Sequence, residues 1–188
     1  MAITSHPNLL DASKAALLVI DIQEGFRNII PDFALLASRA STAVTGFQML
    51  GLPVLVTEQY PKGLGRTAEE IQLALPDGFE VYEKTAFSSC GASQLVEKLE
   101  SLKVKQVVVC GLEIHVCVNQ TAHDLLELGF AVHILCDCVS SRFEYNRLAG
   151  LAKMSRSGVV ESSIEMAFFE LMRDAKHDKF KLVQALIK

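Results

Sequence analysis

Hydrophobic residues make up 50% of the 188 residues of the chain, and charged residues make up 21%. This length and composition predict one globular domain over residues 1–188, large enough to fold without disulfides or a structural metal. The formal net charge of −4 shows no basic excess, so nucleic acid is not an expected partner.

The N-terminal region lacks the basic start and apolar core of a secretion signal, and the early apolar run from Ala15 to Ile20 is too short to cross a membrane. We therefore expect a cytoplasmic protein without a membrane partner. Its five cysteines are odd in number and lack the spacing of a zinc ribbon, so we interpret most of them as structural thiols. They are Cys90, Cys110, Cys117, Cys136 and Cys138.

Strand and helix patterns alternate along the chain. Short apolar runs predict strands at 16–22, 53–57, 80–83, 106–110, 131–136 and 158–161. Apolar residues at helical spacing predict helices around 36–50, 95–102, 117–128 and 142–156, a helix opened by the capping box Ser162-x-x-Glu165, and a helix from Lys179 onward. This alternation indicates an α/β fold with a parallel sheet, in which ligands bind beyond the carboxyl ends of the strands.

Three chemically useful side chains lie at this expected edge. Asp21 ends the first strand, Lys84 follows the third, and Cys117 lies in the turn after the fourth. Taken singly, the aspartate could cap a turn, the lysine could be solvated, and the cysteine could pack as a small hydrophobe. Together they indicate a thiol whose thiolate is favoured by a helix N-terminus and an ammonium, beside a carboxylate that can move its proton.

Three sequence blocks occur in an order and spacing that resemble the isochorismatase-like hydrolases, which include nicotinamidases and N-carbamoylsarcosine amidases. The blocks are LLVIDIQEGF at 17–26, YEKTAFSSC at 82–90 and VVVCGLEIHVCVNQTAHDLLELGF at 107–130. The resemblance covers essentially the whole chain. It implies a single-domain Rossmann-like parallel sheet with strand order 3-2-1-4-5-6 and helices on both faces.

The resemblance also implies a role for each residue of the site. Cys117 would be the nucleophile, Asp21 the base that takes its proton and later activates water, and Lys84 the cation that keeps both charged. The turn from Gly111 to Cys117 matches the oxyanion loop of the family. The match implies a cis peptide between Leu112 and Glu113, and backbone amides of Glu113 and Cys117 that face the developing oxyanion.

The chain departs from this family pattern in two places. Nicotinamidases carry an Asp/His metal cluster after the second strand, whereas TEQYPKGLG at 57–65 contains no histidine and resembles a subgroup whose substrates are mostly unassigned. Glu58 alone is a poor divalent site, so we predict no metal and no cofactor. True isochorismatases act without a nucleophilic thiol, so the presence of Cys117 points away from their reaction.

Several residues beside these motifs are candidates for the substrate pocket. Phe26, Tyr60 and Phe87 either line an apolar pocket or belong to the core. His115 invites a Cys-His dyad interpretation, but the sequence offers no orienting partner for it, so we predict a pocket wall. His123 and His133 are expected to be packing or surface residues.

These observations predict a hydrolase that cleaves a small amide or related C–N bond through a thioester at Cys117. The alternative is a non-catalytic oligomeric module that keeps the fold. We also expect a homo-oligomer, because the family commonly assembles and because apolar residues crowd more than one face of a late helix. These residues are Phe168, Phe169, Leu171 and Met172.

Overall fold

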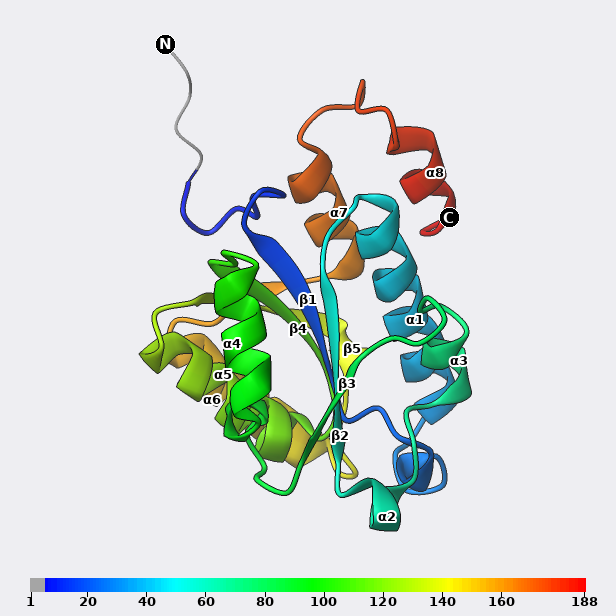
Figure 1. Cartoon of the computed structure of the whole chain (residues 1–188), viewed down its shortest axis with the longest axis vertical. Helices are drawn as coiled ribbons and strands as arrows, with labels where there is room; N and C mark the ends of the chain where they lie inside the picture. The colour runs from blue at the N-terminus through cyan, green and yellow to red at the C-terminus, as the bar shows by residue number, and fades with distance from the viewer. Residues whose placement is uncertain (1–5) are drawn as a thin grey trace.

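The computed structural model describes residues 6–188 and contains one sheet of six parallel strands (Figure 1). The strands are β1 (Ala15–Ile20), β2 (Val54–Gln59), β3 (Val81–Lys84), β4 (Gln106–Gly111), β5 (Ala131–Val139) and β6 (Val160–Ser162). Their order in the sheet is β3-β2-β1-β4-β5-β6. This order confirms the α/β sheet expected from the resemblance.

Apart from Gln106 at the start of β4, the two central strands carry no polar side chain, because helices cover both faces of the sheet. Every residue of β1 and of β4 is buried. Ile20 at the end of β1 pairs with Thr57 of β2 on one side and with Gly111 of β4 on the other. The carboxyl ends of these three strands therefore meet at one edge, where the loops carrying the candidate site begin.

Helices lie on both faces of the sheet, as Figure 1 shows. On one face lie α1 (Phe33–Met49), α3 (Glu69–Gln72), α7 (Ile164–Met172) and α8 (Phe180–Ala185), and on the other lie α4 (Ser93–Ser101), α5 (Asn119–Glu127) and α6 (Glu144–Arg156). The remaining helical segments are the short turns η1 (Glu24–Phe26), α2 (Pro61–Leu64), η2 (Ser89–Gly91) and η3 (Ile114–Val118).

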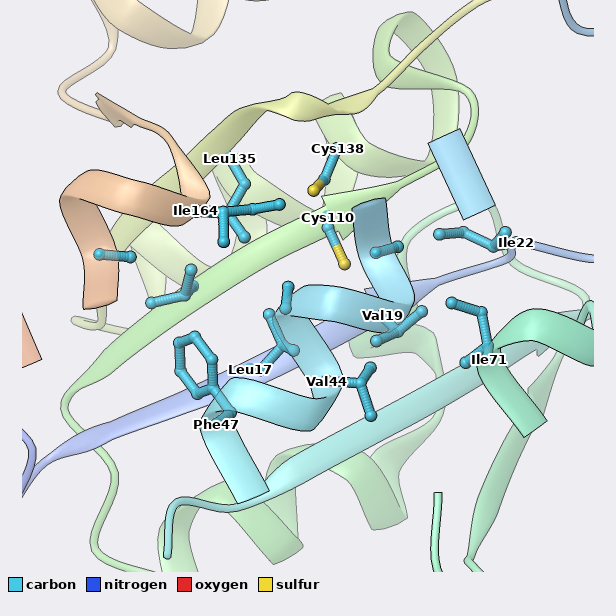
Figure 2. Close-up of a cluster of buried hydrophobic side chains, with 14 of the residues drawn as sticks. Leu17, Val19, Ile22, Val44, Phe47, Ile71, Cys110, Leu135, Cys138 and Ile164 are labelled. Carbon is cyan, nitrogen blue, oxygen red and sulfur yellow. The ribbon is translucent and has the colours of Figure 1, made fainter. Parts of the chain in front are cut away.

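The larger core cluster joins α1 and α7 to the sheet (Figure 2). Leu17 and Val19 of β1 point into it, and the rings of Phe47 and Phe168 lie 6.4 Å apart between centroids. Gly46 permits this approach, because a Cβ atom there would meet the Phe168 ring at 2.0 Å. Substitution of Gly46 is therefore expected to separate α1 from α7.

One expectation for α7 was wrong, and another holds only in part. The capping residue is Ser163, whose hydroxyl accepts a hydrogen bond from the Met166 amide, so the helix begins one residue later than the Ser162 box predicts. Phe168, Leu171 and Met172 are buried against α1 and the sheet, while Phe169 contacts the ring of Phe180 but is 38% exposed. The chain itself therefore covers most of the apolar surface of α7, which removes one argument for an oligomer.

Within residues 6–188, no helix is both long enough and apolar enough to cross a membrane.

Candidate active site

The structure brings Asp21, Lys84 and Cys117 together at the carboxyl edge of the sheet. Asp21 follows β1, Lys84 ends β3, and Cys117 lies in the π-helical turn η3 between β4 and α5. The Lys84 Nζ atom donates a hydrogen bond to Asp21 Oδ2 at 2.6 Å. All three residues are buried, with Cys117 7% exposed. A charged pair and a thiol thus share one largely dehydrated position.

The backbone and a neighbouring hydroxyl hold Asp21 in place. Its φ of +52° lies in the left-handed region, which aspartate tolerates better than most residues but which still costs free energy. The Asp21 amide donates to the Thr57 carbonyl, and the Thr57 hydroxyl donates to Asp21 Oδ1 at 2.8 Å. Asp21 is therefore fixed by β2 as well as by its own strand. Such strain is typical of functional sites.

Lys84 is held by acceptors that the sequence patterns did not single out. Its Nζ atom donates to Gln59 Oε1 at 2.8 Å and to the Phe87 carbonyl at 3.0 Å, in addition to Asp21. Gln59 is fixed in turn, because its backbone amide donates a hydrogen bond to Gln23 Oε1 at 2.8 Å. Gln23 follows β1 and Gln59 ends β2. This position at the predicted ligand-binding edge is the sequence signal that could have identified them.

The turn between β4 and η3 differs from the geometry implied by the resemblance. The peptide between Leu112 and Glu113 is trans, so the expectation of a cis bond was wrong. The chain instead turns at Gly111, whose φ of +142° favours glycine. A Cβ atom at Gly111 would lie 2.1 Å from the Ile20 carbonyl oxygen, so the close approach of β4 to β1 also requires glycine.

Side chains from the segment after β5 support this loop. Glu113 Oε1 accepts hydrogen bonds from the Arg142 amide at 3.0 Å and from Arg142 Nε at 2.9 Å. His115 Nδ1 lies 2.8 Å from the Ser141 hydroxyl, so this histidine does have an orienting partner. The Glu113 side chain is therefore a structural element of the loop.

The surroundings of Cys117 favour the neutral thiol over the thiolate. Burial, followed by the neighbouring Asp21 carboxylate, raises the pKa of Cys117 to about 12, and the Lys84 ammonium opposes this shift. This shift runs against the expectation of a thiolate favoured by the helix and the lysine. Burial also raises the pKa of Asp21, with Lys84 and Thr57 opposing the shift. The arrangement pairs a neutral thiol with a carboxylate of increased basicity.

The four residues predicted to line the substrate pocket lie in different environments. Tyr60 lines a hollow of about 460 Å³ next to Lys84, whereas Phe26 packs against the core cluster of α1. Phe87 is 54% exposed and its carbonyl accepts from Lys84, and His115 contacts Ser141. A shared pocket for these side chains remains a prediction.

Glu58, near the end of β2, has a structural role. Glu58 Oε1 accepts hydrogen bonds from the amide and the hydroxyl of Thr67, at 2.6 Å and 2.7 Å. Among the residues that the structure describes, no group of three or more His, Cys, Asp or Glu side chains is arranged to hold a metal ion. The five cysteines are free thiols.

The structure thus combines a parallel α/β sheet with a buried cluster of Asp21, Lys84 and Cys117 at its carboxyl edge. The family model for the isochorismatase domain matches residues 15–165, and the chain belongs to this family. It is 39% identical over 179 residues to isochorismatase domain-containing protein 2 of Danio rerio, covering 95% of this chain and 89% of the relative.

Solved structures show the same fold. The MAR1 ribonuclease of Caenorhabditis elegans superimposes with a TM-score of 0.88 and 36% identity, covering 95% of this chain and 92% of that one. The YcaC gene product of Escherichia coli, an octameric hydrolase of unknown specificity, gives a TM-score of 0.88 at 23% identity, covering 98% of this chain and 91% of that one.

Proposed function

We propose that this chain is a cysteine hydrolase that cleaves a small amide or related C–N bond through a thioester at Cys117. The observation that carries this proposal is the position of the buried Asp21–Lys84 ion pair beside a thiol at the carboxyl edge of the sheet. A carboxylate that is out of water and next to a thiol is suited to take its proton during attack.

The first half of the reaction forms the thioester. The Cys117 sulfur attacks the carbonyl carbon while its proton passes to Asp21, and an S–C bond forms. The C–N bond then breaks, and the nitrogen leaves as an amine or ammonia with the proton from Asp21. In the second half, Asp21 takes a proton from water and the hydroxide attacks the thioester carbon. The S–C bond breaks, the acid product leaves, and Asp21 returns its proton to the sulfur, which regenerates the Cys117 thiol.

The raised pKa of Cys117 fits a concerted transfer of this kind. Because the thiol is neutral at rest, the proton has to move as the sulfur attacks, and Asp21 is the neighbouring base. Lys84 balances the charge of Asp21 whenever the carboxylate is ionised. Backbone amides of Glu113 and Cys117 are proposed as oxyanion donors, a contribution of about 3 kcal/mol for each well-placed donor.

RNA cleavage, the activity in the name of the Caenorhabditis elegans relative, is less well supported for this chain. RNA binding depends on cations that reach the phosphate backbone, and the formal net charge here is −4. Lys84, the cation of the site, is buried and bound to Asp21. We therefore favour a small-molecule amide as the substrate, with no metal or other cofactor.

We also propose a homo-oligomer in the cytoplasm. One face of α6, which we call the α6 face, leaves Tyr145, Leu148, Ala149 and Ala152 exposed, and the ring of Tyr145 stacks on Phe143 at 5.4 Å. An exposed apolar stripe on a helix is typical of a surface that a second subunit covers. The octameric assembly named for the Escherichia coli protein supports the same expectation.

A screen for hydrolysis tests the proposed function directly. A panel of small amides, ureides and carbamoyl compounds is incubated with the purified protein, and ammonia or amine release is measured. Cys117→Ala should abolish every activity found, whereas Cys136→Ala, the matched control, should retain it. Release that persists in Cys117→Ala would place the reaction elsewhere, and a protein inert toward the whole panel would favour the non-catalytic module.

A further inference from the structure

We infer that the hydroxyl groups of Ser89 and Thr57 form a directed pair that orients the Asp21 carboxylate and limits its basicity. Both are positioning residues, because they act through Asp21 and not on the substrate. This inference rests on the proposed function, in which Asp21 is the base. It stands on the contacts and the burial of the two hydroxyl groups.

The two hydroxyl groups reach Asp21 from different parts of the chain. Thr57 belongs to β2, and Ser89 belongs to the short turn η2 after β3. Thr57 Oγ1 donates to Asp21 Oδ1 at 2.8 Å, and Ser89 Oγ lies 3.4 Å from Thr57 Oγ1. Asp21, Thr57 and Ser89 are each 0% exposed. The hydrogen bond to this carboxylate oxygen therefore comes from the protein and not from bulk water.

The burial of Ser89 determines the direction of the pair. A hydroxyl group carries one hydrogen atom, and a buried donor without an acceptor costs free energy. Among the described residues, the hydrogen-bond partner of Ser89 Oγ is Thr57 Oγ1. We therefore place the Ser89 hydrogen on Thr57 Oγ1, which directs the Thr57 hydrogen to Asp21 Oδ1. Hydrogen bonds aligned in such a chain strengthen one another.

The backbone of each residue is fixed by a further contact. Thr57 pairs with Ile20 in the sheet, and its carbonyl accepts a hydrogen bond from the Asp21 amide at 3.2 Å. The Ser89 amide donates to Thr121 Oγ1 of α5 at 2.8 Å. Strand β2, turn η2 and helix α5 therefore hold the two hydroxyl groups in place beside Asp21.

The two oxygen atoms of Asp21 are bound by donors of different charge. Lys84 Nζ donates to Oδ2 at 2.6 Å, and the neutral Thr57 hydroxyl donates to Oδ1. A hydrogen bond to an ionised carboxylate stabilises the charged form and lowers its basicity. Because both oxygens are bound, the carboxylate cannot rotate without breaking a buried hydrogen bond. The Thr57 hydroxyl should therefore fix the direction in which Asp21 receives the proton of Cys117.

Thr57→Val and Thr57→Ser separate the hydroxyl group from the packing of the side chain. Valine has nearly the shape of threonine without the hydroxyl, whereas serine keeps the hydroxyl and loses a methyl group. Magnetic resonance of isotope-labelled aspartate carboxyl carbons over a pH series reports the titration of Asp21 in the full chain without substrate. Its signal is assigned by its loss in Asp21→Asn. The charged and titratable groups that act on Asp21, Lys84 of β3 and Cys117 of η3, are the same in both variants.

Thr57→Val should raise the titration midpoint of Asp21 by about one pH unit, because a donor to the charged form is lost, and Thr57→Ser should restore it. Ser89→Ala should give a smaller shift in the same direction, because its contact is the longer one. Thr45→Val removes a hydroxyl that donates to the Ser41 carbonyl on α1, and this control should leave the midpoint unchanged. An unchanged midpoint in Thr57→Val, an equal shift in Thr57→Ser or no shift in Ser89→Ala would overturn the directed pair.

Kinetics give a second measurement. On any amide that the protein hydrolyses, Thr57→Val should lower kcat by about tenfold with KM little changed, because the base loses its orientation while the substrate contacts remain. The magnetic resonance titration does not require turnover, so a shift of the midpoint in a protein that hydrolyses no amide would reject the function and keep the hydroxyl pair. Hydrolysis that depends on Cys117 but keeps its wild-type kcat in Thr57→Val would reject the positioning role and keep the function.

Discussion

The Nζ atom of Lys84 lies 2.6 Å from Oδ2 of Asp21, and each side chain is 1% exposed. The pair spans the ends of β3 and β1, and Thr57 and Gln59 of the intervening strand β2 contact one partner each. Because both charges are out of water, each depends on the other. This relationship governs the protonation of the thiol and a part of the stability of the fold.

Asp21→Asn should separate thiol reactivity from turnover. Loss of the base should reduce kcat/KM by about a hundredfold or more. Loss of the negative charge should lower the pKa of Cys117, which Asp21 raises, so alkylation by iodoacetamide at about pH 8 should become faster. Hydrolysis assays and peptide mass spectrometry check the two effects, with the exposed Asp77→Asn as control. Slower alkylation in Asp21→Asn would show that Asp21 promotes the thiolate.

Lys84→Met should destabilise the fold by about 3 to 5 kcal/mol, because it leaves the Asp21 carboxylate buried without its partner. The double variant Asp21→Leu/Lys84→Met should recover much of this loss. Urea unfolding monitored by circular dichroism measures the free energy of unfolding of both variants. Lys14 forms an exposed ion pair with Asp11 and provides the control. Lys14→Met should change the free energy of unfolding by less than about 1 kcal/mol. A Lys84 variant as stable as Lys14→Met would contradict the prediction.

His133 should make the protein less stable in acid. The residue is 1% exposed, neither ring nitrogen has a partner among the described residues, and burial lowers its pKa below the ordinary value of 6.5. As pH falls below 6.5, the unfolded chain binds a proton that the folded state resists, so stability is lost. His133→Phe should show a smaller loss between about pH 7 and about pH 5 in urea titrations. An identical loss of stability in the wild-type protein and in His133→Phe would exclude His133 as the source of the acid sensitivity.

Light scattering should give a mass that is a multiple of the 20.6 kDa chain mass. Leu148→Glu places a charge on the exposed α6 face and should shift the mass toward that of one chain. Leu73→Glu, at an exposed position beyond α3, is the matched control and should not change the mass. A wild-type mass of one chain over a wide concentration range would end the proposal of an oligomer.

Activity should survive exhaustive chelation, because Tyr60 follows β2 where related metal-binding members carry a histidine and Glu58 is bound to Thr67. Ammonia release before and after dialysis against a chelator is the measurement. Loss of activity that added zinc, manganese or iron restores would reveal a metal site built from residues we have not identified.

The sequence alone determined the alternation of strands and helices and the edge at which the chemistry lies. Apolar runs such as 106–110 end where a buried strand must end, and the side chains that follow such runs gather at one edge because parallel strands share a direction. Asp21, Lys84 and Cys117 could therefore be predicted as neighbours. Prediction of the strand order required the family resemblance, because local patterns do not specify which strands pair.

Only the tertiary structure decided how the site is charged and held. The φ of Asp21, the trans peptide at Leu112 and the bonds from Lys84 to Gln59 depend on chain segments that meet through the sheet. The same holds for the thiol of Cys117, since the helix start predicted a favoured thiolate whereas burial and Asp21 raise its pKa. Local periodicity fixes which face of an element is apolar, but dehydration and charge pairing arise only when distant segments pack together.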